Sequence, residues 1–491
     1  MKKIKLLLAS LVLAAFAFQG CEDMDDHAVP VNDFIWKGLN LYYLWQENVP
    51  NLADDRFANQ EQLNNFLESY GSPESLFESL LYRKFPDGTN ADRFSVMFPD
   101  FRVLENVLQG VATSNGIDYG LAYADDARVN VLGYVRYVLP NTDAAAKNVK
   151  RGDLFYAVNG TQLTVSNYQQ LLAQANYTLS LASYVDGVPT PTGVTVELTK
   201  AEYAENPVHT VRVVEQGGSK IGYLMYNGFY GNYDADLNNA FAELKAAGVN
   251  ELVLDLRYNG GGSVRTATYL ASMITGQFTG QLFAKQQWNS KLEAYYQANN
   301  PAALQNLFSD NLSNGAAINH LNLSRVYIIA TGDTASASEL VINCLTPYIG
   351  VTVIGEKTVG KNVGSVTLYD SPDFSRNKIS GSHRYAMQPI VIRTVNKDGF
   401  GEYSAGINPS PGMVQEEKVD NMGELGNPQE PLFAKAISAI TGVSSGRVAK
   451  SNLRDNQLIK FQNTKSMRRF GTDMYLEEMP EGSLNLMKQL Q

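Results

Sequence analysis

The stretch Glu251-Leu252-Val253-Leu254-Asp255-Leu256-Arg257-Tyr258-Asn259-Gly260-Gly261-Gly262 runs from an apolar segment directly into three glycines. A short apolar run that ends at a turn signal is typical of a buried strand in a parallel sheet. Glycines allow a backbone to approach a ligand closely while its N–H groups stay exposed. Taken alone, the pattern favours a strand-to-helix connection that binds nothing.

The sequence around this stretch alternates between strand and helix patterns from about residue 206 to residue 445. We predict strands at 220–226, 326–330 and 351–354, and helices at 234–247, 264–274 and 335–345. Strands that alternate with helices favour a parallel sheet covered by helices. Residues 206–445 are therefore predicted to form an α/β core.

The rest of the chain falls into regions of different character. Residues 30–105 carry apolar residues at helical spacing and predict a helical N-terminal domain. Residues 106–205 alternate as strands do, and Asn159-Gly160 is typical of a hairpin turn. Residues 446–491 mix charges without periodicity, so this tail receives no predicted role. The expected fold class is a multidomain combination of α+β and α/β units.

A cluster of small residues follows the predicted strand 326–330. It reads Thr334-Ala335-Ser336-Ala337-Ser338-Glu339. A serine at a helix N-terminus has amide donors beside its hydroxyl, although either serine could equally be a helix cap without chemistry. After the next strand comes Gly355-Glu356-Lys357-Thr358-Val359-Gly360-Lys361, which places two lysines near the same end of the core.

A nucleophilic serine needs a base, and histidine is scarce in this chain. None of the four histidines lies in a motif that couples it to a serine: His27, His209, His320 and His383. A lysine can serve if desolvation lowers its pKa from about 10.4 toward roughly 7–8, at a cost on the order of 4 kcal/mol. Val359 and Val363 would give Lys361 apolar surroundings.

The three motifs together resemble the carboxy-terminal processing (tail-specific) serine peptidases, whose motifs read approximately DLRxNxGG, SASE and GExTxGK. Their order matches, and Ser336 and Lys361 lie 25 positions apart, which is also that family's spacing. The resemblance extends over about residues 30–445 and implies a core of the ClpP/crotonase-like type. It also implies hydrolysis of peptide bonds.

The resemblance assigns roles residue by residue. It implies that Ser336 is the nucleophile and Lys361 the general base. The backbone N–H of Gly261 or Gly262, together with that of Ala337, would form the oxyanion hole. Lys357 would then be a surface lysine, and Ser338 a residue of the helix start.

Two positions depart from the family pattern. Ser365 stands where many relatives have a Gln that orients the lysine, so Ser365 is the expected orienting residue here. Asn362 replaces the commoner Gly after the lysine. These departures leave open a weak or inactive enzyme that keeps its domains as a peptide-binding scaffold.

Part of the region 106–205 resembles a PDZ domain. The resemblance lies in residues 144–160, Ala-Ala-Ala-Lys-Asn-Val-Lys-Arg-Gly-Asp-Leu-Phe-Tyr-Ala-Val-Asn-Gly. The loop that would hold a substrate's terminal carboxylate, Gly116-Ile117-Asp118-Tyr119-Gly120-Leu121, departs from the usual pattern and carries an acid. Capture of a substrate's C-terminus at this loop is therefore not expected.

The first residues predict export. Residues 1–20 combine lysines with an apolar run too short to span a bilayer, as in a signal peptide. Gly20-Cys21 resembles a lipobox, so Cys21 is the predicted lipidation site, although an ordinary signal with an incidental cysteine is the alternative. Residues 21–29 form an acidic tether. The chain is expected to be anchored by lipid alone in a bacterial outer membrane, on the periplasmic side or at the cell surface.

The charge and the motifs of the chain exclude several classes of ligand and partner. The net charge of −10 and pI of about 5.1 argue against a nucleic-acid partner. Residues 355–362 share part of a phosphate-loop pattern, but Asn362 stands at the magnesium-binding position and a strand is predicted to follow. Penicillin-binding motifs occur only in reversed order. A peptide or protein substrate is expected, no cofactor or metal is expected, and the oligomeric state is left open. Cys344 is predicted to be a buried packing residue.

Overall fold

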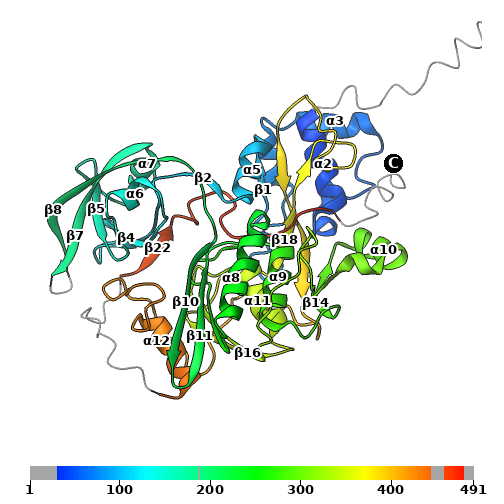
Figure 1. Ribbon diagram of the computed structural model, residues 1–491. Coiled ribbons are helices and arrows are strands. Elements are labelled where there is room, and N and C mark those ends of the chain that lie inside the picture. The colour runs from blue at the N-terminus through cyan, green and yellow to red at the C-terminus, as the bar shows by residue number, and fades with distance from the viewer. Residues whose placement is uncertain (1–29, 186–187, 444–457, 480–491) are drawn as a thin grey trace, which may run out of the picture.

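The computed structural model describes residues 30–185, 188–443 and 458–479. The predicted signal peptide, Cys21 and the acidic tether lie outside the described residues. Within the described part of the chain, no helix combines the length and the apolar composition needed to cross a bilayer. The protein is a mixed α/β molecule of several units (Figure 1).

The centre of the molecule is a five-stranded sheet with the order β10-β11-β12-β16-β17. The strands are β10 (Val208–Gln216), β11 (Ser219–Tyr226), β12 (Glu251–Asp255), β16 (Arg325–Ala330) and β17 (Gly350–Gly355). β10 runs antiparallel to β11, and the other four strands are parallel. The strands and helices predicted for the core are found to within about two residues at each end.

Helices cover both faces of this sheet because successive side chains of a strand point to opposite faces. Leu252 and Leu254 of β12 pack on one side, with α8 (Asp234–Ala246), α9 (Val264–Thr275) and α11 (Ala337–Leu345). Val253, which lies between those two leucines, packs on the other side against α12 (Pro431–Thr441).

The three predicted motifs meet at one edge of the sheet. The glycine turn follows β12, the serine cluster follows β16, and the loop with Lys361 follows β17. The carboxyl ends of parallel strands lie at the same edge, where ligand sites of α/β sheets form. The topology therefore brings together segments that are up to about 100 residues apart in the chain.

A second, six-stranded sheet has the order β13-β23-β18-β21-β14-β15. Its strands are β13 (Gly261–Ser263), β23 (Asp473–Leu476), β18 (Val363–Val366), β21 (Ile390–Val395), β14 (Leu282–Gln287) and β15 (Gln305–Leu307). The short helix α10 (Ser290–Asn299) and the 3-10 turn η4 (Pro301–Leu304) connect its last two strands.

The N-terminal segment is helical, as predicted, and packs into the same hydrophobic core. Its helices are α2 (Pro30–Tyr42), α3 (Gln60–Glu68), α4 (Pro73–Ser79) and α5 (Phe101–Leu108), with the 3-10 turns η1 (Gln46–Asn48) and η2 (Pro50–Leu52). The strand β1 (Val96–Phe98) joins β20 (Ala386–Gln388) and β19 (Leu368–Tyr369) in a small sheet. The segment is thereby fixed next to the loops of the core.

The small β unit contains a seven-stranded sheet with its own hydrophobic core. The path runs β22-β3-β4-β5-β7-β8, and β6 pairs with β5. The elements are β3 (Ile117–Tyr123), β4 (Val131–Val138), α6 (Asp143–Ala146), β5 (Leu154–Val158), β6 (Thr161–Gln162), α7 (Tyr168–Ala173), β7 (Asn176–Val185) and β8 (Val188–Thr199). β2 (Val111–Ser114) and β9 (Ala201–Ala204) pair at its base, and η3 (Gly231–Tyr233) precedes α8.

The tail contributes one strand to each of two sheets. β22 (Lys460–Asn463) pairs antiparallel with β3 of the small β unit. β23 then pairs in parallel with both β13 and β18. In Figure 1 this red segment passes from the small sheet to the region of β18. Residues for which the sequence predicts no role thus connect the two units.

Candidate active site

The serine cluster is joined to the glycine turn by hydrogen bonds between the two loops. Thr334 donates its hydroxyl to the carbonyl of Leu256 at 2.8 Å. The carbonyl of Asn259 accepts the Ala335 amide and the Ser338 hydroxyl, each at 3.1 Å. Because these small residues bond to backbone atoms, the two loops are held in one arrangement.

Ser336 lies at the N-cap of α11 in a strained backbone conformation. Its φ is +66°, a value that residues other than glycine rarely adopt. Such strain costs on the order of 1–3 kcal/mol and gathers at functional sites. The side chain is fully buried, and its Oγ has no hydrogen-bond partner within the described residues. A hydroxyl held in this way suits attack on a bound group more than a structural role.

Glu339 joins the nucleophile segment to the lysine segment. Its buried carboxylate accepts the amides of Ser336 at 2.7 Å, Gly360 at 2.7 Å and Lys361 at 2.8 Å, and also the Thr358 hydroxyl. Burial raises the pKa of the Glu339 carboxyl, and these hydrogen bonds oppose that rise. The sequence motif contained Glu339, but its role as a common acceptor was not predicted.

The amine of Lys361 is fully buried in an aromatic pocket. Its Nζ lies 4.8 Å from the ring centroid of Phe94 and 5.5 Å from that of Phe470. It donates a hydrogen bond of 2.6 Å to the carbonyl oxygen of Thr472 in the tail. Since the Ser336 hydroxyl has no partner, the expected bond between Lys361 and Ser336 is not formed in this state.

The two amides of the glycine turn that were predicted as oxyanion donors, those of Gly261 and Gly262, face different partners. The Gly261 amide donates to Asn259 Oδ1 at 2.9 Å and is therefore occupied. The Gly261 carbonyl and the Ser263 amide bond to Phe229 on one side of β13. Since backbone groups alternate along a strand, the N–H of Gly262 faces the other side, where β23 pairs. A Cβ at Gly262 would lie 2.3 Å from the Phe229 oxygen, so this position requires glycine.

A buried ionic cluster fixes the strand that precedes the turn. Arg257 bonds to Asp255, Glu417 and Glu430, and its side chain and those of Asp255 and Glu430 are fully buried. The positive charges of Arg151 and Arg257 hold the pKa of Glu417 well below its usual range, although burial opposes this shift. Glu417 and Glu430 lie far from the motif in the sequence and were not predicted.

Two arginines connect the small β unit to this edge of the core. Arg136 pairs with Asp118 of its own unit and with Asp333 of the serine loop. Arg151 donates to Glu417 at 2.6 Å and to the Tyr258 hydroxyl at 2.7 Å. The unit is thereby held directly against the loops of the site.

The remaining predicted residues are placed as follows. Ser365 is buried, and its hydroxyl donates to the carbonyl of Met474 at 3.3 Å, an atom of the tail. Lys357 is exposed. Cys344 is buried, as predicted, and burial raises the pKa of its thiol well above the usual value.

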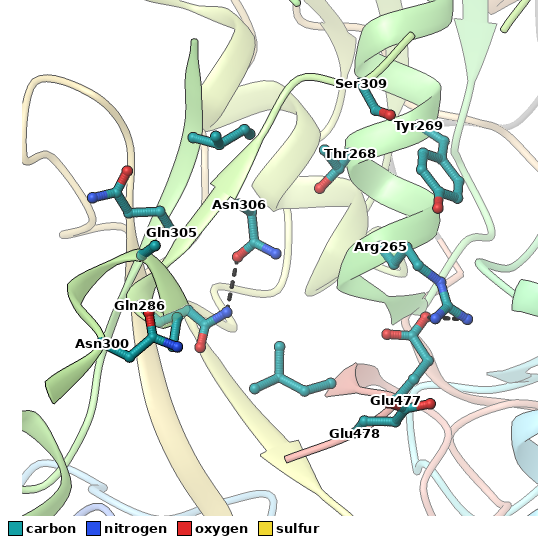
Figure 2. Close-up of a pocket in the computed structure, with 14 residues that line it drawn as sticks. Arg265, Thr268, Tyr269, Gln286, Asn300, Gln305, Asn306, Ser309, Glu477 and Glu478 are labelled. Atoms are coloured by element: carbon teal, nitrogen blue, oxygen red, sulfur yellow. Dashed lines mark hydrogen bonds and ion pairs between the residues drawn. The ribbon is translucent and has the colours of Figure 1, made fainter. Parts of the chain in front are cut away.

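A cavity of about 620 Å³ lies where the tail leaves β23. Figure 2 shows Glu477 facing Arg265 of α9, with Asn306 and Gln286 across the cavity. Arg265 and Glu477 form an ion pair of 3.5 Å. None of Ser336, Lys361 and the glycine turn lines this cavity.

Comparison with known proteins shows which family of peptidases the chain resembles. The model for peptidase family S41 matches residues 220–383, and the model for the peptidase S41 N-terminal domain matches residues 30–96. A putative S41 protease structure from Bacteroides fragilis covers 83% of this chain and 97% of its own, with 27% identity and a TM-score of 0.64. The chain is thus similar to peptidases in its sequence and in its fold.

Curated relatives agree with this assignment. A carboxyl-terminal-processing protease of Picosynechococcus is 27% identical over 54% of this chain and 58% of its own length. A chloroplastic C-terminal processing peptidase of Tetradesmus obliquus is 26% identical over 52% of this chain and 56% of its own. The chain therefore spans little more than half the length of these relatives. The chain is similar to peptidase family S41 over residues 30–96 and 220–383.

Proposed function

We propose that this chain hydrolyses peptide bonds with Ser336 as nucleophile and Lys361 as general base. One observation carries the proposal: the Glu339 carboxylate binds the amides of both residues, beside a buried serine hydroxyl without a partner. A carboxylate that joins the backbones of two loops positions their side chains toward one place. The buried surroundings of Lys361 favour the uncharged amine that a base requires.

The proposed reaction has two halves. The Ser336 Oγ attacks the scissile carbonyl while its proton passes to the neutral Lys361 amine. The amides of Ala337 and Gly262 stabilise the oxyanion, and each such donor is worth about 10²–10³ in rate. The tetrahedral intermediate then expels the amine product, which takes the proton from Lys361. A water molecule, deprotonated by Lys361, hydrolyses the acyl-enzyme.

The finer domain assignments belong to this proposal. We assign the small β unit, residues 106–205, to a PDZ-like peptide-binding role, which the addition of the strand β22 along β3 supports. We assign residues 206–445 to a ClpP/crotonase-like core and Cys21 to a lipid anchor on an exported protein. The substrate is a peptide or protein, because relatives carry the name of processing peptidases.

The test is cleavage of a fluorogenic peptide library by the wild type and by Ser336→Ala. Turnover by the wild type and its loss in the variant would support the proposal. Peptide binding without turnover in either chain would favour a non-catalytic scaffold instead. A fluorophosphonate probe gives a second readout, because it forms a covalent adduct with an activated serine.

A further inference from the structure

The tail binds the small β unit in the way that a peptide ligand binds an edge strand. β22 adds antiparallel to β3 at the edge of the seven-stranded sheet. Phe461 of β22 stacks on Tyr123 with ring centroids 4.6 Å apart and meets Tyr168 of α7 edge-on at 5.6 Å. Strand addition with side chains in a groove is a common mode of peptide recognition.

The same tail also adds a strand to the six-stranded sheet of the core. β23 lies between β13, which begins at the glycine turn, and β18, which begins two residues after Lys361. Its main chain takes the side of β13 toward which the Gly262 amide points. An extended substrate that adds as a strand at the proposed oxyanion donor would need this position.

Backbone atoms of the tail contact the proposed catalytic residues directly. The Thr472 carbonyl accepts the Lys361 amine, and the Met474 carbonyl accepts the Ser365 hydroxyl. The Gly471 carbonyl lies so close to the glycine turn that a Cβ at Gly260 would approach it to 2.4 Å. These are contacts through main-chain carbonyls, which any peptide can make.

Charged side chains fix the segment of the tail between β22 and β23, and besides Arg469, which donates to the Met97 carbonyl, Lys465 makes two such bonds. Lys465 donates to the carbonyls of Asn227 and Tyr258, and burial lowers the pKa of its amine. Nearby, Asn463 donates to Asp333 of the serine loop at 2.7 Å. An ammonium buried against carbonyl oxygens is costly to desolvate and is lost as an anchor if its charge is removed.

We propose that residues 458–479 are a tethered peptide ligand that occupies the substrate groove of the core and the peptide groove of the small β unit together, and so holds the enzyme closed. This inference rests on the proposed function. In the closed state the Lys361 amine donates to the Thr472 carbonyl, and the Ser336 hydroxyl has no hydrogen-bond partner among the described residues, so the proposed base and nucleophile are not engaged with each other. The tail must leave before a substrate enters.

The arrangement also indicates the substrate class. A substrate that replaces the tail must be extended over both grooves, with one part paired to β3 and a following part paired to β13 and β18. Folded domains cannot adopt this form. The enzyme therefore takes unstructured chain segments, and its own tail competes with them at an effective concentration on the order of millimolar.

The experiment loosens the tail in the full chain without changing any proposed catalytic residue. Lys465→Glu places a carboxylate against the carbonyls of Asn227 and Tyr258, and Lys465→Met keeps the stem but removes the charge. Lys397→Glu is the matched control, because Lys397 lies on the surface beside Asp398. Turnover of a fluorogenic peptide and anisotropy of a fluorescein-labelled synthetic peptide of residues 458–479 are measured for each chain.

We expect Lys465→Glu to raise turnover at least about tenfold over wild type and control, because a tethered competitor is released. The labelled peptide should bind this variant, inhibit it, and bind the wild type much more weakly. Equal turnover in all chains without peptide binding would overturn the inference and leave the proposed function intact. Peptide binding without turnover in any chain would support the occupied groove and contradict the proposed function. Failure of both Lys465 variants to fold, seen by thermal melting, would show a fixed structural strand and overturn the inference.

Discussion

The two sides of the catalytic groove are held in different ways. The side with Ser336 is fixed by the buried Glu339 carboxylate and by the ionic cluster around Arg257. The side formed by β23 is held by main-chain pairing to two short strands, by hydrogen bonds that its carbonyls accept, by the ion pair between Arg265 and Glu477, and by packing of Met474 and Leu476 into the main core. The proposed catalytic residues are therefore held in place by buried charged groups. The tail strand beside them is attached mainly through its backbone, as an added peptide strand is.

The largest expected effect is a difference in kcat/KM between alanine variants of the two lysines in the loop after β17. Lys361→Ala should lower kcat/KM by about 10³ or more, since the general base is lost. Lys357→Ala should leave kcat/KM near the wild-type value, because Lys357 is exposed. Steady-state kinetics on the fluorogenic peptide measure both. The reverse pattern would mean that the base is Lys357 and that the fixed side of the groove has been misassigned.

The next largest effect concerns Glu339, whose carboxylate joins the Ser336 loop to the Lys361 loop. Glu339→Ala leaves three backbone amides and the Thr358 hydroxyl without their acceptor, at a cost of about 3 kcal/mol or more in unfolding free energy. Turnover should fall as well, because Ser336 and Lys361 lose their common support. Urea unfolding and kinetics are measured together, with Glu402→Ala, a substitution of a surface carboxylate, as the control. Unchanged stability would refute the supporting role of Glu339.

A pH effect probes the contact between α8 and the end of the tail. Burial raises the pKa of Asp234 from 3.8 to about 6, and Glu477 of the tail contributes to the rise. Below about pH 4 the group is protonated in both states. As the pH rises toward 6 the unfolded state ionises first, so stability falls by on the order of 3 kcal/mol and then levels off.

Asp234→Asn should remove this decline, which thermal unfolding between pH 4 and 7 would show. The decline should also be smaller in Lys465→Glu, because release of the tail removes the charge of Glu477. A decline of the same size in Lys465→Glu would indicate that the end of the tail stays in place.

The smallest expected effect is the change in turnover of Ser365→Ala. Whether turnover falls or rises decides between two roles of Ser365. The sequence predicts that Ser365 orients Lys361, so Ser365→Ala would lower turnover. The bond from Ser365 to Met474 predicts the opposite, because its loss weakens the tail by up to about 1 kcal/mol and raises turnover by up to about fivefold. Kinetics of Ser365→Ala beside those of Thr367→Ala give the sign.

The sequence predicted the loops that carry Ser336 and Lys361 better than it predicted the tail strand that lies beside them. Motif positions could be brought together because parallel strands end at one edge of a sheet, and small residues mark the turns there. Glu417 and Glu430 could not be found, since they contact Arg257 from about 160 and 173 positions away. The tail strand could not be found either, because four residues carry no usable periodicity and the atoms that contact Lys361 and Ser365 are backbone carbonyls.

The central claim is that Ser336 is an activated nucleophile covered by the tail. The most direct measurement treats the full-length wild type and Lys465→Glu with a fluorophosphonate and maps the adduct by mass spectrometry. We predict a single adduct on Ser336 that forms faster in Lys465→Glu than in the wild type. An adduct on another residue, or none in a chain that still cleaves peptides, would contradict the account.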